Sequence, residues 1–297
     1  LPNEIIKLDF DLKSETFFLN KDIKKDSNSI IIKSKFYGIE SYGILEKNNN
    51  NKLFIFHGGQ GNSRIPLEYN KFLVFKEELK ENGYDILSLS VGGIGYNRTD
   101  GDISFPTNPN LSRNGLVKKS YETKISKKAN RLRHIFLHYF DSNYPEIDPL
   151  ALLITGNYSI IKLIENDYET ISIAGLSGGG FMTTLFSAII PKIDNSFNFA
   201  GAIPKSYFPP EWNPHALMQG ESNFWKKYSI WHFFFLSILD DKNIINRNHH
   251  LVYGEKDCCI YPPYASSFDK LVEQLDIKGL NVEVINNHTH DIDIEYI

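Results

Sequence analysis

The sequence predicts an α/β fold with a mostly parallel central sheet and helices on both of its faces. Short apolar stretches alternate along the chain with longer stretches whose apolar residues recur every three to four positions. Glycine- and proline-containing turns separate the two kinds of stretch. The 297 residues, 41% of them hydrophobic and 23% charged, also have the composition of a globular protein that can bury a large core.

The N-terminal part is predicted to form three strands. Residues 29–36 and 40–46 read as two strands joined by a glycine-containing turn. A third apolar stretch, 53–56, follows and ends at His57. We expect these three strands to form an antiparallel entry to the sheet.

Beyond His57 the predicted strands and helices alternate, as parallel sheets require. Residues 67–82 have apolar side chains at helical spacing, and Gly83 is a natural helix stop. A long polar loop is predicted over 92–116. The other predicted elements are strand 84–91, helix 118–140, helix 149–165 with a break near Gly156, strand 170–174, a helix from Phe181 that Pro191 ends, strand 197–203, strand 250–253, helix 264–275 and strand 281–285.

One stretch does not fit this alternation. Residues 205–248 lie between two predicted strands and are far longer than one helix with short connections. The stretch is rich in aromatic residues and contains all three tryptophans of the chain, Trp212, Trp225 and Trp231. We therefore predict a core domain of residues 1–204 and 249–297 and a helical cap of residues 205–248. Its tryptophans are candidates for substrate binding, and packing within the cap is the alternative.

The strongest chemical motif is Gly175-Leu176-Ser177-Gly178-Gly179, between a predicted strand and a predicted helix. A serine hydroxyl becomes a useful nucleophile when a tight turn holds it out of the chain beside a base. Small residues on both sides make such a strained turn possible. The amide of Gly178, at the start of the helix, is then placed to bind a developing oxyanion.

A second glycine-rich segment, His57-Gly58-Gly59-Gln60-Gly61, follows the third predicted strand. Consecutive glycines allow backbone amides to turn toward a reacting oxygen, so the amide of Gly59 or Gln60 is a candidate second oxyanion donor. A plain glycine-rich turn is the alternative. The Lys-Ser/Thr pair of a phosphate-binding loop is missing.

An acid and a base follow the last two predicted strands. Asp257 lies just beyond the apolar strand that ends near Tyr253, where a carboxylate can orient a histidine, and Glu255 is its local rival. Beyond Ile285, His290 is our choice for the general base and His288 the second choice. The longer reach of His290 lets the loop curl back over the end of the sheet.

Ser177, Asp257 and His290 each follow a predicted strand at its carboxyl end, where open α/β sheets bind ligands. With the HGG, GLSGG, YGEKD and HTHD segments, the chain resembles the α/β-hydrolase superfamily, in its esterase/lipase/peptidase branch, over about residues 29–290. The resemblance implies Ser177 as nucleophile, His290 as base, Asp257 as orienting acid, and Gly178 with Gly59 or Gln60 as oxyanion donors. The base region lacks the Gly-His pair common in that superfamily, and Gln60 replaces a third glycine.

The function that these residues imply is the hydrolysis of a carboxylic ester through an acyl-enzyme. The substrate would be a small-molecule or polymer-borne acyl group, and no cofactor is needed. A peptidase, a thioesterase and an acyltransferase would use the same residues. A non-catalytic binding module on a hydrolase scaffold is the alternative from another class.

Other partners are not expected. The net charge of −4 does not favour nucleic-acid binding, and no apolar run reaches the roughly 18 residues of a membrane span. The chain starts at Leu1, so we expect a leader or a tag to have been removed and favour an exported protein. We also expect no metal site, because adjacent cysteines chelate one zinc poorly and no C-x-x-C spacing exists. The residues considered as metal ligands are His249, His250, Cys258, Cys259, His288 and His290.

Overall fold

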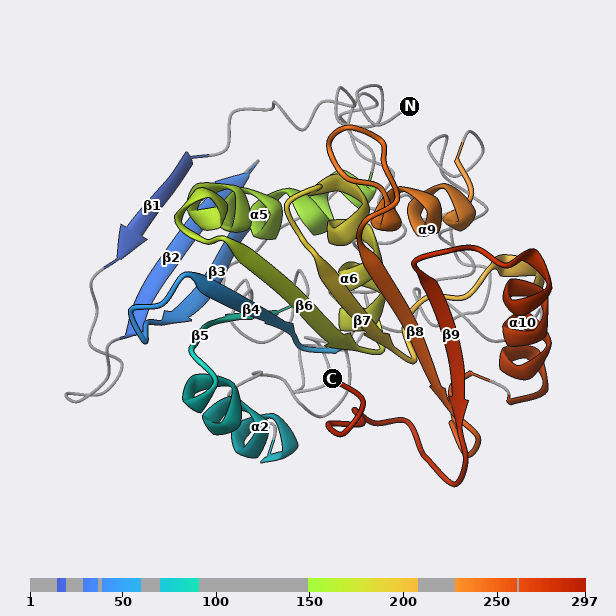
Figure 1. The fold of residues 1–297 in the computed structure, drawn as a ribbon. Helices are drawn as coiled ribbons and strands as arrows, with labels where there is room; N and C mark the ends of the chain where they lie inside the picture. Colours follow the sequence, from blue (N-terminus) through green and yellow to red (C-terminus); the bar gives the residue numbers. More distant parts are fainter. Residues whose placement is uncertain are drawn as a thin grey trace, which may run out of the picture.

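A computed structural model describes residues 15–19, 29–36, 39–59, 70–90, 149–207, 228–260 and 262–297. Their strands form one nine-stranded sheet in the order β1-β2-β3-β5-β4-β6-β7-β8-β9 (Figure 1). Strands β1, β2 and β3 pair antiparallel, and β3 also meets β5 antiparallel. Every pairing from β5 through β9 is parallel. The predicted α/β class with a mostly parallel sheet is confirmed.

Apart from β1, which was not predicted from the sequence, the elements lie close to their predicted positions. The strands are β1 Glu15–Leu19, β2 Ser29–Phe36, β3 Ile39–Glu46, β4 Lys52–His57, β5 Tyr84–Leu89, β6 Thr170–Leu176, β7 Asn195–Phe199, β8 Asn248–Gly254 and β9 Leu280–Ile285. The helices are α2 Asn70–Glu81, α5 Pro149–Ile164, α6 Gly178–Ile189, α9 Ile230–Ile238 and α10 Pro262–Leu275, with short 3₁₀ turns at Glu165–Asp167 and Lys205–Tyr207. Among these helices, none has the length and apolar character needed to cross a bilayer.

The antiparallel entry differs from the prediction in its third strand. β4 does not pair with β3; it lies between β5 and β6 and is parallel to both. Leu53 through His57 are all buried, which is typical of a central strand covered on both faces. The chain therefore crosses from the antiparallel edge into the middle of the sheet before β4 begins.

Alternating side chains of β4 show which helices cover each face. Phe56 stacks on Phe72 of α2 with ring centroids 3.8 Å apart, so α2 covers the face to which Phe56 points. His57 points to the other face, where its ring lies 5.8 Å from that of Phe186 in α6. Helix α5 lies on this second face too, because its Asn157 is hydrogen-bonded to His57.

Helix α5 is continuous, so the predicted break near Gly156 is wrong. A Cβ on Gly156 would lie 2.6 Å from the Cβ of Ser41 on β3. Because Gly156 has no side chain, helix α5 can approach the sheet closely at this point, and the glycine does not interrupt the helix.

The described part of the predicted cap packs with the core. Ile230, Phe233 and Phe234 of α9 are buried, and the Phe234 ring lies 5.9 Å from Phe268 of α10. Residues 208–227, with Trp212 and Trp225, lie outside the described residues, so the cap stays a prediction there. Gln60, the polar loop 92–116 and the helix expected at 118–140 also lie outside the described residues.

The C-terminal segment covers part of the α2 face of the sheet. Tyr296 meets the rings of Phe197 and Phe199 edge-on, at centroid distances of 6.5 and 6.4 Å. Figure 1 shows this segment running back from the end of β9, past the lower ends of β8 and β7 in this view, toward the middle of the sheet. The turn that begins this segment carries His290, so its packing helps to hold that residue in place.

Candidate active site

Ser177 occupies the turn between β6 and α6. Its backbone has φ 57° and ψ −120°, a conformation that residues other than glycine rarely adopt. The amide of Ser177 donates to the carbonyl of Phe199 at 2.8 Å, which fixes the turn to the neighbouring strand. Ser177 is partly exposed, whereas residues 171–176 and 178–190 are all buried. The turn thus presents one side chain of a buried stretch to solvent.

The flanking glycines are required by close backbone approaches. A Cβ on Gly175 would clash with the backbone of Gly179, and a Cβ on Gly179 would clash with the carbonyl of His57. The strand–turn–helix motif predicted from sequence is therefore present, with the glycines in the expected role.

The glycine-rich segment after β4 lies directly beside this turn. A Cβ on Gly59 would lie 2.5 Å from the Leu176 carbonyl oxygen and 3.4 Å from the Ser177 Cβ. Gly178 is the first residue of α6, and the first amides of an α-helix have no partner within the helix. Backbone from two segments far apart in sequence thus borders Ser177, as an oxyanion hole needs.

A buried imidazole anchors the glycine-rich segment. The Asn157 Nδ2 donates to His57 Nε2 at 3.0 Å and to the Ser90 carbonyl at 2.8 Å. Since Nε2 accepts, His57 Nδ1 carries the proton and donates to the Gly58 carbonyl at 3.1 Å. Burial lowers the pKa of His57 to about 4, so the ring is neutral at pH 7. Sequence reasoning missed Asn157, although a lone amide in an apolar helix is a usable signal.

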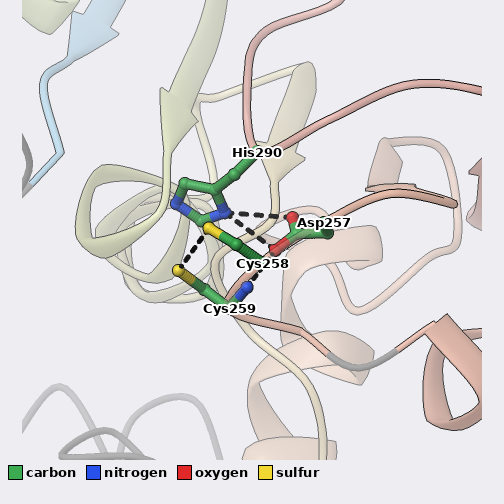
Figure 2. Close-up of side chains that lie close together, drawn as sticks. All are labelled: Asp257, Cys258, Cys259 and His290. Carbon is green, nitrogen blue, oxygen red and sulfur yellow. Dashed lines mark hydrogen bonds and ion pairs between the residues drawn. The ribbon is translucent and has the colours of Figure 1, made fainter.

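Asp257 and His290 form a hydrogen-bonded pair (Figure 2). The His290 Nδ1 lies 3.0 Å from each carboxylate oxygen of Asp257. The amides of Cys259 and Ile260 donate to the same carboxylate at 2.6 and 2.8 Å. Because a carboxylate only accepts, Nδ1 carries the proton of the neutral ring and Nε2 is left as the acceptor.

The rival residues have other partners. Glu255 accepts the amide of Asn287 at 2.8 Å and so holds the turn after β9. His288 donates from Nε2 to the Asp291 carbonyl at 3.1 Å. The structure therefore pairs Asp257 with His290, and neither Glu255 nor His288 takes a place in this pair.

Strand register brings this pair and Ser177 to the same edge of the sheet. Leu176 at the end of β6 is level with Phe199 of β7, which is level with Val252 of β8. Asp257 and His290 follow the ends of β8 and β9. Within the described residues no hydrogen bond joins the Ser177 hydroxyl to His290. Such bonds are often long in a site without substrate and shorten when the complex forms.

A second buried network lies beneath the turn, and sequence reasoning missed it. The Asn198 Nδ2 donates to the Thr184 hydroxyl at 2.9 Å, and this hydroxyl lies 3.1 Å from His249 Nε2. His249 Nδ1 lies 2.6 Å from the Ser196 hydroxyl. The Asn198 Oδ1 accepts the Gly201 amide at 2.8 Å, so the network fixes the loop after β7. The polar residues alternating with phenylalanines in β7 are its sequence signal.

Trp231 lies in an aromatic cluster between two helices. Its ring is 5.7 Å from Phe234 of α9 and 5.5 Å from Phe268 of α10, edge-on in both pairs. Packing between the two helices is therefore sufficient to account for a tryptophan at position 231. A substrate-binding role for Trp231 stays a prediction.

The sheet order, the strained serine turn and the helices on both faces define the class: the chain has the α/β-hydrolase fold. No family model matches the sequence, and no curated protein is significantly similar to it. Solved structures do match. Acetyl xylan esterase 1 from Thermoanaerobacterium sp. JW/SL YS485 has a TM-score of 0.58 and 12% identity, over 98% of this chain and 87% of that chain.

Two further structures have the same fold. Est1E from Butyrivibrio proteoclasticus with ferulic acid bound has a TM-score of 0.50 and 17% identity, over 88% of this chain and 92% of that chain. A puromycin-hydrolyzing peptidase from Mycobacterium tuberculosis has a TM-score of 0.52 and 12% identity; the match covers 90% of this chain and 36% of that much longer chain.

Proposed function

We propose that the protein is a serine hydrolase that cleaves carboxylic esters through an acyl-enzyme. The observation that carries the proposal is the strained Ser177 turn at the edge of the sheet where Asp257 and His290 form their pair. A partly exposed serine in such a turn is suited to nucleophilic attack. The arrangement also supplies an imidazole with one nitrogen left as acceptor.

In the proposed reaction the Ser177 Oγ attacks the acyl carbonyl carbon while His290 Nε2 takes the hydroxyl proton. Asp257 stabilises the resulting imidazolium, and the amides of Gly178 and of Gly59 or Gln60 bind the oxyanion. The alcohol then leaves with the proton from His290. Water then attacks the acyl-enzyme carbonyl carbon and gives a proton to His290. The bond to the Ser177 Oγ breaks, His290 returns the proton to this oxygen, and the acid is released.

The similar structures suggest which acyl groups to test first. One of them is an acetyl xylan esterase and another holds ferulic acid. We therefore propose acetyl esters and esters of aromatic acids, on small molecules or polymers, as the first substrates to assay. The identity with these proteins, 12% and 17%, leaves the preferred acyl group to experiment.

The test is the turnover of a p-nitrophenyl ester series, from acetate to long acyl chains and including the ferulate, with Ser177→Ala as the matched variant. We expect wild type to exceed the variant by about 10³-fold or more on its best ester, because removing a nucleophile leaves only binding and the oxyanion hole. Equal, slow rates for both proteins on every ester would overturn the proposal.

A peptidase is the second candidate, since one similar structure is a puromycin-hydrolyzing peptidase. Aminoacyl p-nitroanilides and acyl thioesters belong in the same assay. Faster turnover of an anilide or a thioester than of any ester, lost in Ser177→Ala, would keep the nucleophile and replace the esterase assignment.

A further inference from the structure

Two thiols lie against the Asp257–His290 pair (Figure 2). Cys258 and Cys259 are both exposed, and their sulfurs are 3.1 Å apart. The two sulfurs, one carboxylate oxygen of Asp257 and one imidazole nitrogen of His290 all lie within 4.8 Å of one another. Adjacent cysteines are poor chelators when their side chains diverge, but here the two side chains converge.

These four donor atoms suit a thiophilic divalent cation. Two sulfurs, an imidazole nitrogen and a carboxylate oxygen are all zinc ligands, and structural zinc sites take four of them in a tetrahedron. Zn–S bonds of about 2.3 Å and Zn–N bonds of about 2.0 Å place the ligand atoms roughly 3.3–3.8 Å apart. The four donors within 4.8 Å reach that spacing through small side-chain rotations.

The surroundings favour entry and retention of such an ion. The two cysteines are exposed residues and so lie at the solvent side of the site, while the Asp257 side chain is fully buried beside His290. The amides of Cys259 and Ile260 hold one carboxylate oxygen in place, as hydrogen bonds to a metal-ligating carboxylate do in metal sites.

We propose that Cys258, Cys259, His290 and Asp257 bind Zn²⁺ and that the bound ion inhibits the enzyme. The cation would bind the two thiolates, the Asp257 carboxylate and the His290 Nδ1, taking the position of the proton that Nδ1 now shares with Asp257. Both thiols lose their protons to solvent. The neutral imidazole loses its proton from Nδ1 and takes one up on Nε2, so two protons are released for each ion bound.

Inhibition follows from this change of tautomer. With its proton on Nε2, the imidazole is a donor toward Ser177 and can no longer act as the general base. The ion also uses the carboxylate that would stabilise the imidazolium. The inhibition rests on the proposed function, whereas binding of the ion does not, so binding and activity are measured separately.

Binding is tested with Co²⁺, whose absorption reports thiolate ligation and tetrahedral geometry, on the full chain after chelator treatment. We expect thiolate-to-cobalt charge-transfer and tetrahedral d–d bands that Zn²⁺ abolishes by competition. The bands should be missing in the Cys258→Ser/Cys259→Ser variant, with folding checked by circular dichroism. Wild type without these bands, or a double variant that keeps them, would overturn the proposed site whether or not the protein hydrolyses esters.

Inhibition is tested by the ratio of ester turnover with and without micromolar Zn²⁺, compared between wild type and the same double variant. We expect the wild-type rate to fall at least tenfold with Zn²⁺ and to return with chelator, and the ratio for the double variant to stay near one. Equal inhibition of both proteins, or none in a wild type that shows the cobalt bands, would overturn the inhibitory role.

Discussion

His290 and His249 each have Nδ1 hydrogen-bonded to an oxygen, yet their surroundings differ in every other respect. His249 is fully buried, with hydroxyls of Ser196 and Thr184 at its two nitrogens. The side chain of His290 is 19% exposed and faces the carboxylate of Asp257. Among the described residues, no group is hydrogen-bonded to the His290 Nε2.

The difference shows what separates a structural imidazole from one suited to proton transfer. Burial lowers the pKa of His249 to about 3, with smaller contributions from His250 and Arg247, so its ring stays neutral and links two hydroxyls. A general base must instead accept a proton and have the cation stabilised. Among the histidines discussed, His290 alone combines an adjacent carboxylate with access to the edge of the sheet where Ser177 lies.

The largest expected effect in this comparison is on catalysis. His290→Ala should lower kcat for the best ester by about 10³-fold or more, because the serine loses its base. His288→Ala, two positions away, is the matched control and should lower it far less, since its imidazole is bonded to the Asp291 carbonyl. Steady-state kinetics with both purified proteins measures this. A larger loss in His288→Ala would move the base to His288.

The next effect is on stability. His249→Ala should lower the free energy of unfolding by about 2–4 kcal/mol, because it leaves a cavity and removes one hydrogen-bond partner from each of two buried hydroxyls. His250→Ala is the control, with an expected loss of about 1 kcal/mol, since this half-buried ring stacks on Phe197 and contacts Tyr296 but belongs to no fully buried hydrogen-bond network. Urea unfolding measures both. A His249→Ala protein as stable as wild type would show that the network does not support the fold.

The smallest effect, taken per histidine and per pH unit, is a pH dependence of stability. Burial lowers the pKa of His57 to about 4, that of His249 to about 3 and that of His250 in the same direction, from 6.5. Between these values and pH 6.5 the unfolded chain binds protons that the folded chain does not. Stability is therefore complete above about pH 6.5 and falls as the pH decreases toward 4.

Each fully buried histidine should contribute a slope of about 1.4 kcal/mol per pH unit between pH 6 and 5. Urea unfolding at several pH values gives the slope of the free energy of unfolding against pH. His249→Ala should reduce this slope by about 1.4 kcal/mol per pH unit, which corresponds to one proton. An unchanged slope in that variant would mean that His249 becomes protonated in the folded protein.

Local sequence signals indicated where the segments of the candidate site lie along the chain. The strand–turn–helix around Ser177 is formed by consecutive residues, so its glycines could be identified without tertiary information. The pairing of Asp257 with His290, which lie in different loops, follows from strand order and reach. A turn held by Glu255 places His290, and not His288, beside the acid, while the choice of His290 as the base stays a prediction.

Features that depend on contacts between distant segments could not be predicted. The position of β4 beside β6 depends on a chain crossing, which an apolar strand does not reveal. From the sequence, Gly156 suggests a helix break, and only the close approach of α5 to Ser41 explains why glycine is needed there. The close approach of the Cys258 and Cys259 sulfurs likewise depends on a turn conformation that cannot be predicted from two adjacent cysteines in the sequence.

The most direct test of the central claim is covalent labelling with a fluorophosphonate probe, followed by peptide mapping by mass spectrometry. The account predicts one adduct, on Ser177, formed rapidly in wild type and at least about 10³-fold more slowly in His290→Ala, because the probe reacts with an activated serine. A folded wild-type protein that takes up no probe, or carries the adduct on another residue, would contradict it.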